Sequence, residues 1–124
     1  MRYAAVVEQL YGRPVLFVRD ASAAAAFYCK QLGFGQDWVH EEQGEVVVVQ
    51  VSRWGYEIIL NRDTERAGKG RIFFSLCEQQ KAPLRESLAR AGVPASQRSW
   101  GMAVTEVRDP DGNELLLHPP LLER

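Results

Sequence analysis

The chain has 124 residues, which is about the length of one domain. Hydrophobic residues make up 46% and charged residues 25%, and 15 Lys and Arg against 16 Asp and Glu give a net charge of −1. This composition, with only two cysteines, excludes collagen-like, disordered and disulfide-rich chains and argues against nonspecific nucleic-acid binding. No apolar run approaches the ~20 residues that span a bilayer, and the first residues lack the apolar core of a secretory signal. We therefore expect a cytoplasmic protein whose partner is neither a membrane nor a nucleic acid.

The first half of the chain predicts a strand, a helix and three further strands after a lead-in over residues 1–12. Val15–Val18 is a short run of strand-forming residues. Four alanines and a helical spacing of aromatic and apolar residues predict a helix over Ala23–Leu32, which Gly33 ends. Three more strands are expected at 36–40, 46–51 and 56–61, the last two joined by a tight turn at Trp54-Gly55.

The second half begins in the same way. A strand is predicted over Arg71–Cys77, and a helix follows over Gln80–Ala91, with Pro83 in its first turn and Gly92 after its end. The remaining elements are two strands, at 99–107 and 113–118, separated by the turn sequence Asp109-Pro110-Asp111-Gly112.

The two halves form an internal repeat. At a shift of 57 residues, Val46–Asn61 lies on Ala103–His118 without a gap, and at a shift of 58 Arg13 lies on Arg71. Chance likeness between two strand–helix–hairpin units is the alternative, since much of the match is generic apolar character. The repeat predicts one α+β domain over residues 1–124, built from two β-α-β-β-β modules at about 13–62 and 70–118.

Several motifs resemble those of the vicinal oxygen chelate superfamily, which includes glyoxalase I, extradiol dioxygenases, and fosfomycin- and bleomycin-resistance proteins. They are Pro14–Asp20, Leu32-Gly33-Phe34, Trp100-Gly101 and the closing hairpin Asp109–Leu115. The resemblance covers roughly residues 13–118 and is nearest to the bleomycin-resistance branch. It implies that each module curls its mixed sheet into a half-barrel, that two modules form a cleft, and that the protein is a homodimer.

The resemblance also places the family's metal ligands at Arg13, Ile59, Arg71 and Leu116. None of these side chains offers a lone pair to a cation. Glu57 and Glu114 have the same strand parity as Ile59 and Leu116, and whether they face the cleft stays open. Two carboxylates without imidazoles make a poor transition-metal site, so we expect no metal, no cofactor and no catalytic residue.

Aromatic residues suggest a ligand site instead. Phe34, Trp38, Trp54 and Trp100 are predicted at strand edges or turns, where a flat apolar face suits stacking on a planar ligand. By resemblance, Phe34, Trp38 and Trp100 match positions near the groove where bleomycin-resistance proteins hold their drug. Core packing is the alternative for each of them.

Charged residues near these positions point in two directions. The acidic run Asp37, Glu41, Glu42 and Glu45 would suit the cationic tail of a bleomycin-type drug, or it is simply solvated. Arg13 and Arg71, if they face the cleft, favour an anionic or carbonyl-bearing ligand, or they pair with Glu57 and Glu114. His118 shares parity with Leu116 and is either a cleft-facing base or a packing residue.

The sequence therefore predicts a metal-independent protein that sequesters a planar, drug-like ligand, as in bleomycin-type antibiotic resistance. Two alternatives remain: a glyoxalase- or dioxygenase-type enzyme with a non-standard site, and a ligand-sensing module without catalysis. The identity of the ligand, and whether residues 1–12 swap between subunits, stay open.

Overall fold

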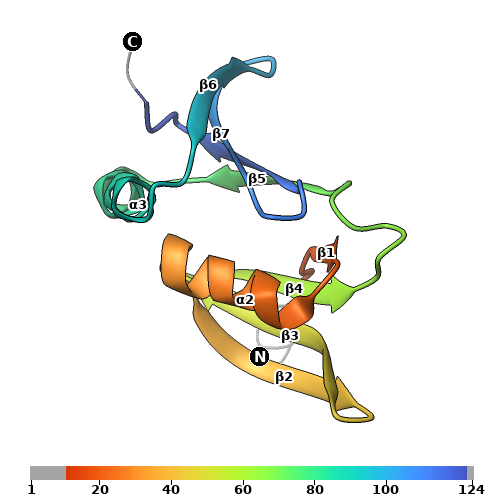
Figure 1. The fold of residues 1–124 in the computed structure, drawn as a ribbon. Helices are drawn as coiled ribbons and strands as arrows, with labels where there is room; N and C mark the ends of the chain where they lie inside the picture. The colour runs from red at the N-terminus through yellow and green to blue at the C-terminus, as the bar shows by residue number, and fades with distance from the viewer. Residues whose placement is uncertain (1–10, 123–124) are drawn as a thin grey trace, which may run out of the picture.

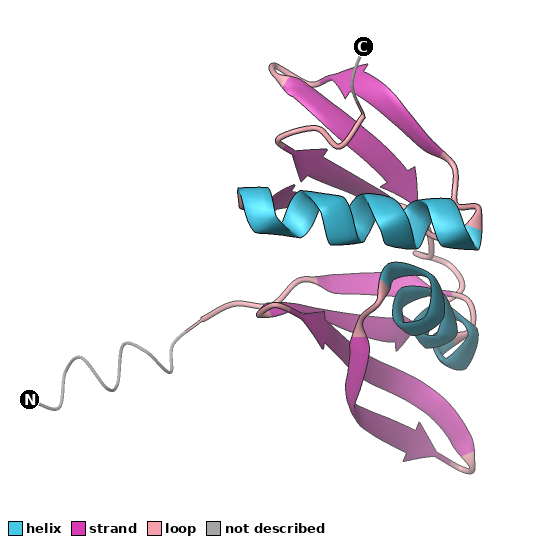
Figure 2. Cartoon of the chain, turned by 90° about the vertical axis from the view of Figure 1, so that its left-hand side faces the viewer, coloured by secondary structure: helices cyan, strands magenta, loops and turns pink. Residues whose placement is uncertain are grey.

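The computed structural model describes residues 11–122 and shows two modules, each with one four-stranded mixed sheet (Figures 1 and 2). The first module runs through β1 (Val15–Val18), α2 (Ala21–Ala26), the π-helical turn η1 (Phe27–Gln31), β2 (Gly35–Glu42), β3 (Glu45–Arg53) and β4 (Tyr56–Arg62). The second runs through β5 (Arg71–Ser75), α3 (Glu78–Ala91), β6 (Ala95–Ser99), β7 (Ala103–Arg108) and β8 (Glu114–His118). The predicted α+β fold of two β-α-β-β-β modules is confirmed, whereas residues 1–10 of the predicted lead-in lie outside the described part.

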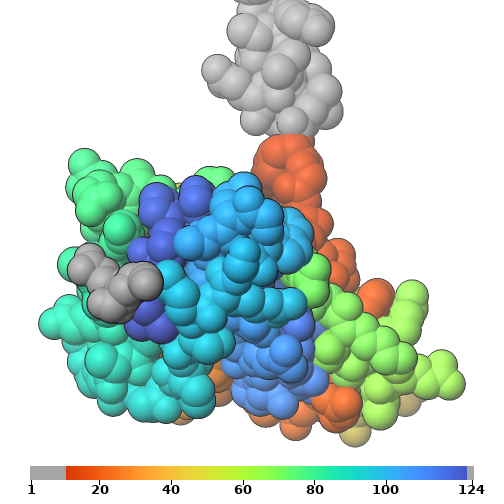
Figure 3. Space-filling model, turned by 90° about the horizontal axis from the view of Figure 1, so that it is seen from above, coloured from red at the N-terminus to blue at the C-terminus, as the bar shows by residue number. Residues whose placement is uncertain are grey.

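The two sheets have the same strand order. They run β1-β4-β3-β2 and β5-β8-β7-β6, with one parallel pair in each, β1 with β4 and β5 with β8. The crossover from the first strand to its parallel partner passes through the helix of each module. In Figure 1 the sheets lie one above the other, with α2 in front of the lower sheet and α3 beside the upper one. Residues of the second module make up most of the face that is seen from above (Figure 3).

The first helix begins two residues earlier than predicted because the Asp20 side chain accepts a hydrogen bond from the Ala23 backbone N–H and caps it. Its second half, from Phe27, widens into a π-helical turn. Gly33 follows with φ of 80°, a left-handed conformation that an L side chain adopts only with strain.

The second helix also starts two residues before the predicted position. Cys77 and Gln80 form a capping box, so the first turn is Glu78–Lys81, and Pro83 lies in the second turn rather than the first. Gly92 ends the helix with φ of 69°, as expected.

The prediction of one strand over 99–107 is wrong. The chain instead makes two antiparallel strands, β6 and β7, around a turn at Trp100-Gly101-Met102 in which the Trp100 N–H donates to the Met102 carbonyl at 2.7 Å. Gly101 has φ of 72° there. β6 is polar and lies at the edge of its sheet, so it lacks the apolar alternation by which strands are recognised.

One hydrophobic core serves both modules. Side chains alternate across each strand, and the buried set faces the helices, as with Leu16 and Leu60 in the first module and Phe74 and Leu117 in the second.

The opposite faces of the sheets have no helix over them. We call these the open face of the first module (Arg13, Asp37, Trp38, Gln50, Ser52, Glu57, Ile59 and Asn61) and the open face of the second module (Arg71, Phe73, Arg98, Trp100, Glu106, Arg108, Glu114, Leu116 and His118).

Candidate functional site

The open face of the second module carries a cluster of three rings. Phe73 lies on β5, His118 ends the neighbouring strand β8, and Trp100 comes from the β6–β7 turn. The Phe73 ring centroid is 5.5 Å from that of Trp100 and 5.9 Å from that of His118, which stacks on it. Phe73 is 36% and Trp100 40% exposed, so both present apolar ring surface to solvent. Such a surface can stack against a planar ligand.

The histidine of this cluster has a defined tautomer. His118 Nδ1 lies 3.0 Å from the Ala103 carbonyl oxygen, which can only accept, so Nδ1 carries the hydrogen. In the neutral ring Nε2 then holds a lone pair and can accept a hydrogen bond.

A network of arginines and glutamates lies beside the rings. Arg71 Nε donates to Glu114 Oε1 at 2.7 Å, and Arg108 Nη2 donates to Glu114 Oε2 at 3.2 Å. Glu106 accepts from Arg98 Nη1 at 2.5 Å and from Arg108 Nε at 2.7 Å. The Arg71 guanidinium carbon is also 5.9 Å from the centre of the Trp100 ring, so Arg71 links the network to the aromatic cluster.

Glu106 is the buried member of the network, with 7% of its surface exposed. Burial alone would raise the pKa of this carboxyl group, but the hydrogen bonds and positive charges of Arg108 and Arg98 outweigh it. The pKa of Glu106 therefore lies below its ordinary value, and the group is ionised at neutral pH.

The open face of the first module is arranged differently. Arg13 Nη1 donates to Gln50 Oε1 at 2.7 Å, and Gln50 Nε2 donates to Asp37 Oδ2 at 2.9 Å. Trp38 is the cross-strand partner of Gln50 and so lies on the same face. Glu57 has one buried carboxylate oxygen without a hydrogen-bond partner among residues 11–122. The structure thus pairs Arg71 with Glu114 but does not pair Arg13 with Glu57.

Two of the predicted ligand residues lie away from both open faces. Phe34 is buried in the core, where its ring meets Tyr28 edge-on at 5.7 Å. Trp54 lies in the β3–β4 turn with the Arg53 guanidinium 3.9 Å from its ring centre, and it borders the core. Of the acidic run, only Asp37 reaches an open face, whereas Glu42 and Glu45 pair with His40 and Arg62 at the β2–β3 end.

The residues at the family's metal positions do not fit a metal ion. Arg13 and Arg71 donate hydrogen bonds to neighbouring side chains, and Ile59 and Leu116 offer no donor atom. Glu57 and Glu114 do lie on the open faces, but in separate modules. Within residues 11–122, no group of three or more His, Cys, Asp or Glu side chains is arranged to hold a metal ion.

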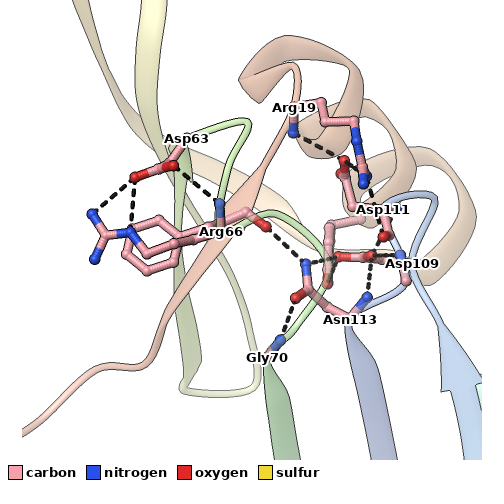
Figure 4. A network of polar contacts seen from close by, with 10 residues as sticks. Arg19, Asp63, Arg66, Gly70, Asp109, Asp111 and Asn113 are labelled. Carbon is pink, nitrogen blue, oxygen red and sulfur yellow. Dashed lines mark hydrogen bonds and ion pairs between the residues drawn. The ribbon is translucent and has the colours of Figure 1, made fainter.

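The closing hairpin, which contributed strongly to the family resemblance, joins the two modules (Figure 4). Asp109 Oδ1 accepts from the backbone N–H groups of Asp111, Gly112 and Asn113, and Oδ2 accepts from the Asn113 amide and from the Tyr28 hydroxyl in the first module. Burial and the neighbouring Asp109 raise the pKa of Tyr28, so its phenol stays protonated and keeps donating.

Asn113 and Asp111 add further contacts. The Asn113 amide donates to the Phe17 carbonyl at 3.1 Å and accepts from the Gly70 N–H at 2.8 Å, and Arg19 pairs with Asp111 at 3.0 Å. Asp109, Asp111 and Asn113 of this motif are therefore structural in this chain, whereas Glu114 belongs to the network on the open face of the second module.

Four residues of this open face were missed by sequence reasoning: Phe73, Arg98, Glu106 and Arg108. Phe73 has the same strand parity as Arg71 on β5, which was available as a signal. The alternation Glu106-Val107-Arg108 places both charges on one face of a strand and was available as a signal. Arg98 was missed because β6 was not recognised as a separate strand.

Two modules of the same strand order, each with one open sheet face, indicate the class to which this protein belongs, and a family model identifies that class. The family model of the Glyoxalase/Bleomycin resistance protein/Dioxygenase superfamily matches residues 10–117. The chain belongs to this superfamily. No curated protein sequence matches it.

Similar solved structures agree on the fold. The bleomycin-binding protein of Streptomyces verticillus, in complex with copper(II)-bleomycin, is 24% identical with a TM-score of 0.68, over 87% of this chain and 93% of that one. A lactoylglutathione lyase from Agrobacterium tumefaciens is 20% identical with a TM-score of 0.63, over 86% and 91%. TioX from Micromonospora sp. ML1 is 15% identical with a TM-score of 0.67, over 87% and 97%. None of the helices in residues 11–122 is long and apolar enough to cross a membrane.

Proposed function

We propose that this protein binds a planar small molecule on the open face of its second module and holds it without a metal ion or a chemical step. The exposed ring cluster of Phe73, Trp100 and His118 is the observation that carries this proposal. Stacking on such rings supplies binding free energy of about 0.5–1.5 kcal/mol per ring pair beyond the area that is buried. Sequestration of a drug-like molecule, as the bleomycin-binding neighbour's name indicates for that protein, is the biological role that fits such a site.

The proposed assembly is a homodimer. In a single chain the ring cluster lies on an uncovered sheet face together with the exposed Met102. A second copy that places the open face of its first module over this surface would bury the rings and turn a shallow face into an enclosed pocket. Analytical ultracentrifugation at micromolar concentration should give twice the mass of one chain, and a monomer would contradict this assembly.

Binding can be tested with a panel of planar compounds that includes metal-free bleomycin and 2-naphthoate, followed by calorimetry and tryptophan fluorescence. We expect micromolar binding of at least one compound and a loss of about tenfold or more in Trp100→Ala, which removes the central ring. Trp54→Ala is the matched control, because Trp54 is 43% exposed but lies at the β3–β4 turn. An equal loss in both variants, or no binding in the panel, would contradict the proposal.

A further inference from the structure

The second module's network has many more unused hydrogen-bond donors than unused acceptors. Both oxygens of Glu106 and both oxygens of Glu114 already accept from arginine. Each guanidinium has five N–H donors, and only one from Arg71, one from Arg98 and two from Arg108 are used in these bonds. Each carboxylate oxygen keeps one further lone pair, so the unused capacity of the network is mainly donating, and three arginines against two glutamates give it a net positive charge.

A groove opens next to the network. It has a volume of about 360 Å³ and is lined by Lys69, Arg71 and Glu114 together with the backbone of three glycines, Gly68, Gly70 and Gly112. Lys69 adds a fourth positive charge to those of Arg71, Arg98 and Arg108, against the two carboxylates of Glu106 and Glu114. The groove is thus a hollow in which positive charge prevails.

Arg71 connects the groove to the rings. It lines the groove, and its guanidinium also lies 5.9 Å from the centre of the Trp100 ring. A ligand whose rings stack on Trp100 and Phe73 would have its edge within reach of Arg71, whose planar fork matches the two oxygens of a carboxylate.

We propose that the ligand of this face is an aromatic carboxylate, whose rings lie on the aromatic cluster and whose anionic group enters the groove between Arg71 and Lys69. This inference rests on the proposed function, since it needs a planar ligand on Trp100. It separates this protein from binders of cationic drugs, because an ammonium group would meet a net positive charge here, and the carboxylates it could reach are already bonded to arginine.

The test compares three probes of one ring system: 2-naphthoate, its neutral amide 2-naphthamide, and the cationic 2-naphthylmethylamine. Calorimetry on the full chain at pH 7.5 and low ionic strength should show naphthoate binding at least tenfold more tightly than either analogue. Raising the salt concentration to 0.5 M should weaken the binding of naphthoate and leave that of the uncharged naphthamide unchanged, because salt screens the attraction between the carboxylate and the groove. Binding of the amine should not weaken, since salt screens its repulsion.

Two variants examine the groove. Arg71→Gln should reduce the preference for naphthoate over naphthamide by about tenfold, and Glu114 keeps its bond from Arg108 at 3.2 Å, so the fold is retained. Lys69→Gln should reduce the preference by a smaller factor. Arg90→Gln removes the same charge from the exposed surface of α3 and should leave the preference unchanged.

The outcomes separate the two proposals. Binding of naphthamide or naphthylmethylamine as tight as that of naphthoate, and dependent on Trp100, overturns the inference and leaves the proposed function standing. A preference that survives in both Arg71→Gln and Lys69→Gln also overturns the inference. Failure of all three probes to bind contradicts the proposed function together with the inference.

Discussion

The two modules have equivalent backbones and very different open faces. Strand pairing sets the correspondence: Ile59 pairs with Val15 and Gln50 in the first sheet, as Leu116 pairs with Phe73 and Glu106 in the second. By the same rule Asn61 corresponds to His118. The second module thus has the ring of Phe73, the carboxylate of Glu106 and the imidazole of His118. At the corresponding positions the first module has Val15, Gln50 and Asn61. One scaffold thus carries a cluster of stacked rings beside an arginine–glutamate network in the second module, and a site argument must be made for each module separately.

The hairpins that close the two sheets differ as well. β3 and β4 are joined by the two-residue turn Trp54-Gly55, with positive φ at both residues, whereas β7 and β8 enclose the longer loop 109–113. The sequence repeat, with its shift of 57 residues, aligns Gln50 with Val107. In the structure the longer loop moves the pairing by one residue, so Gln50 corresponds to Glu106 instead. The first turn is local, while the second loop bonds to both modules. The predictions below test this difference, from the largest effect to the smallest.

Gly68, which lies against the second loop, should be the position most sensitive to an added methyl group. A Cβ there would lie 2.0 Å from the Asp111 carbonyl oxygen, and φ is 80°. Gly68→Ala should therefore destabilise the protein by about 3 kcal/mol or more, through steric overlap with backbone added to the strain of positive φ. Denaturant unfolding measures this effect.

Gly44 provides the matched control in the first module. It has the same φ of 80° in the β2–β3 turn, but a Cβ would meet nothing within 4 Å. Gly44→Ala should lower the free energy of unfolding by about 1 kcal/mol, because only the strain of the positive φ acts there and no steric overlap is added. Equal losses for the two substitutions would show that the contact between Gly68 and the loop is not tight.

Asn113 should rank next. It is 0% exposed and bonds to Gly70, Phe17 and Asp109, so Asn113→Ala would leave the Gly70 N–H without its partner and the Phe17 carbonyl with the Gly68 N–H alone. We expect a loss of about 2–3 kcal/mol in the free energy of unfolding. Asn61→Ala, on the half-buried open face of the first module, should cost less than about 1 kcal/mol. A smaller loss for Asn113→Ala than for Asn61→Ala would contradict a joining role for the loop.

The sequence predicted the modules well because their cores follow simple periodicity. The short apolar runs of β3, β4 and β8 and the glycine-terminated helix α3 could all be recognised locally. β6 could not, because a polar edge strand is held by its backbone ladder with β7 and has no apolar pattern.

The site was predicted less completely, for a related reason. Strand parity relates residues within a module, so the sequence groups Glu114 and His118 with Leu116; in the structure these two lie on one face with Arg71 and Trp100. Whether Phe34 or Trp54 reaches that face depends on how the modules pack, and no local pattern contains that information. Glu106 and Arg108 could have been found from their alternation around Val107, whereas Arg98 became visible only once the β6–β7 register was known.

Glu106 should give the second module an acid-sensitive contribution to stability that Gln50 does not give the first. Its pKa is below the value in the unfolded chain, so its stabilising effect is present above pH ~4.5 and is lost as the pH falls through the folded-state pKa. Glu106→Gln should lower stability at pH 7 by about 1–2 kcal/mol, with a gap that closes toward pH 3.

Chemical denaturation at pH 7, 5 and 3 follows this gap. Glu45→Gln removes the carboxylate of an exposed pair with Arg62 and should change stability by less than about 0.5 kcal/mol at each pH. A Glu106→Gln gap that stays constant from pH 7 to pH 3 would mean that the charge of Glu106 contributes nothing.

The turn of the first module should tolerate change best. Trp54 has φ of 55° at the first turn position, where asparagine is preferred and a bulky side chain is strained. Trp54→Asn relieves that strain but loses the stacking of Arg53 at 3.9 Å and some contact with the core, so we expect the two effects to offset to within about 0.5 kcal/mol. Thermal unfolding and naphthoate titration of the same variant measure both consequences. Unchanged binding would agree with a ligand surface confined to the second module, whereas a loss as large as that of Trp100→Ala would extend the surface to the β3–β4 turn and remove the asymmetry between the two modules.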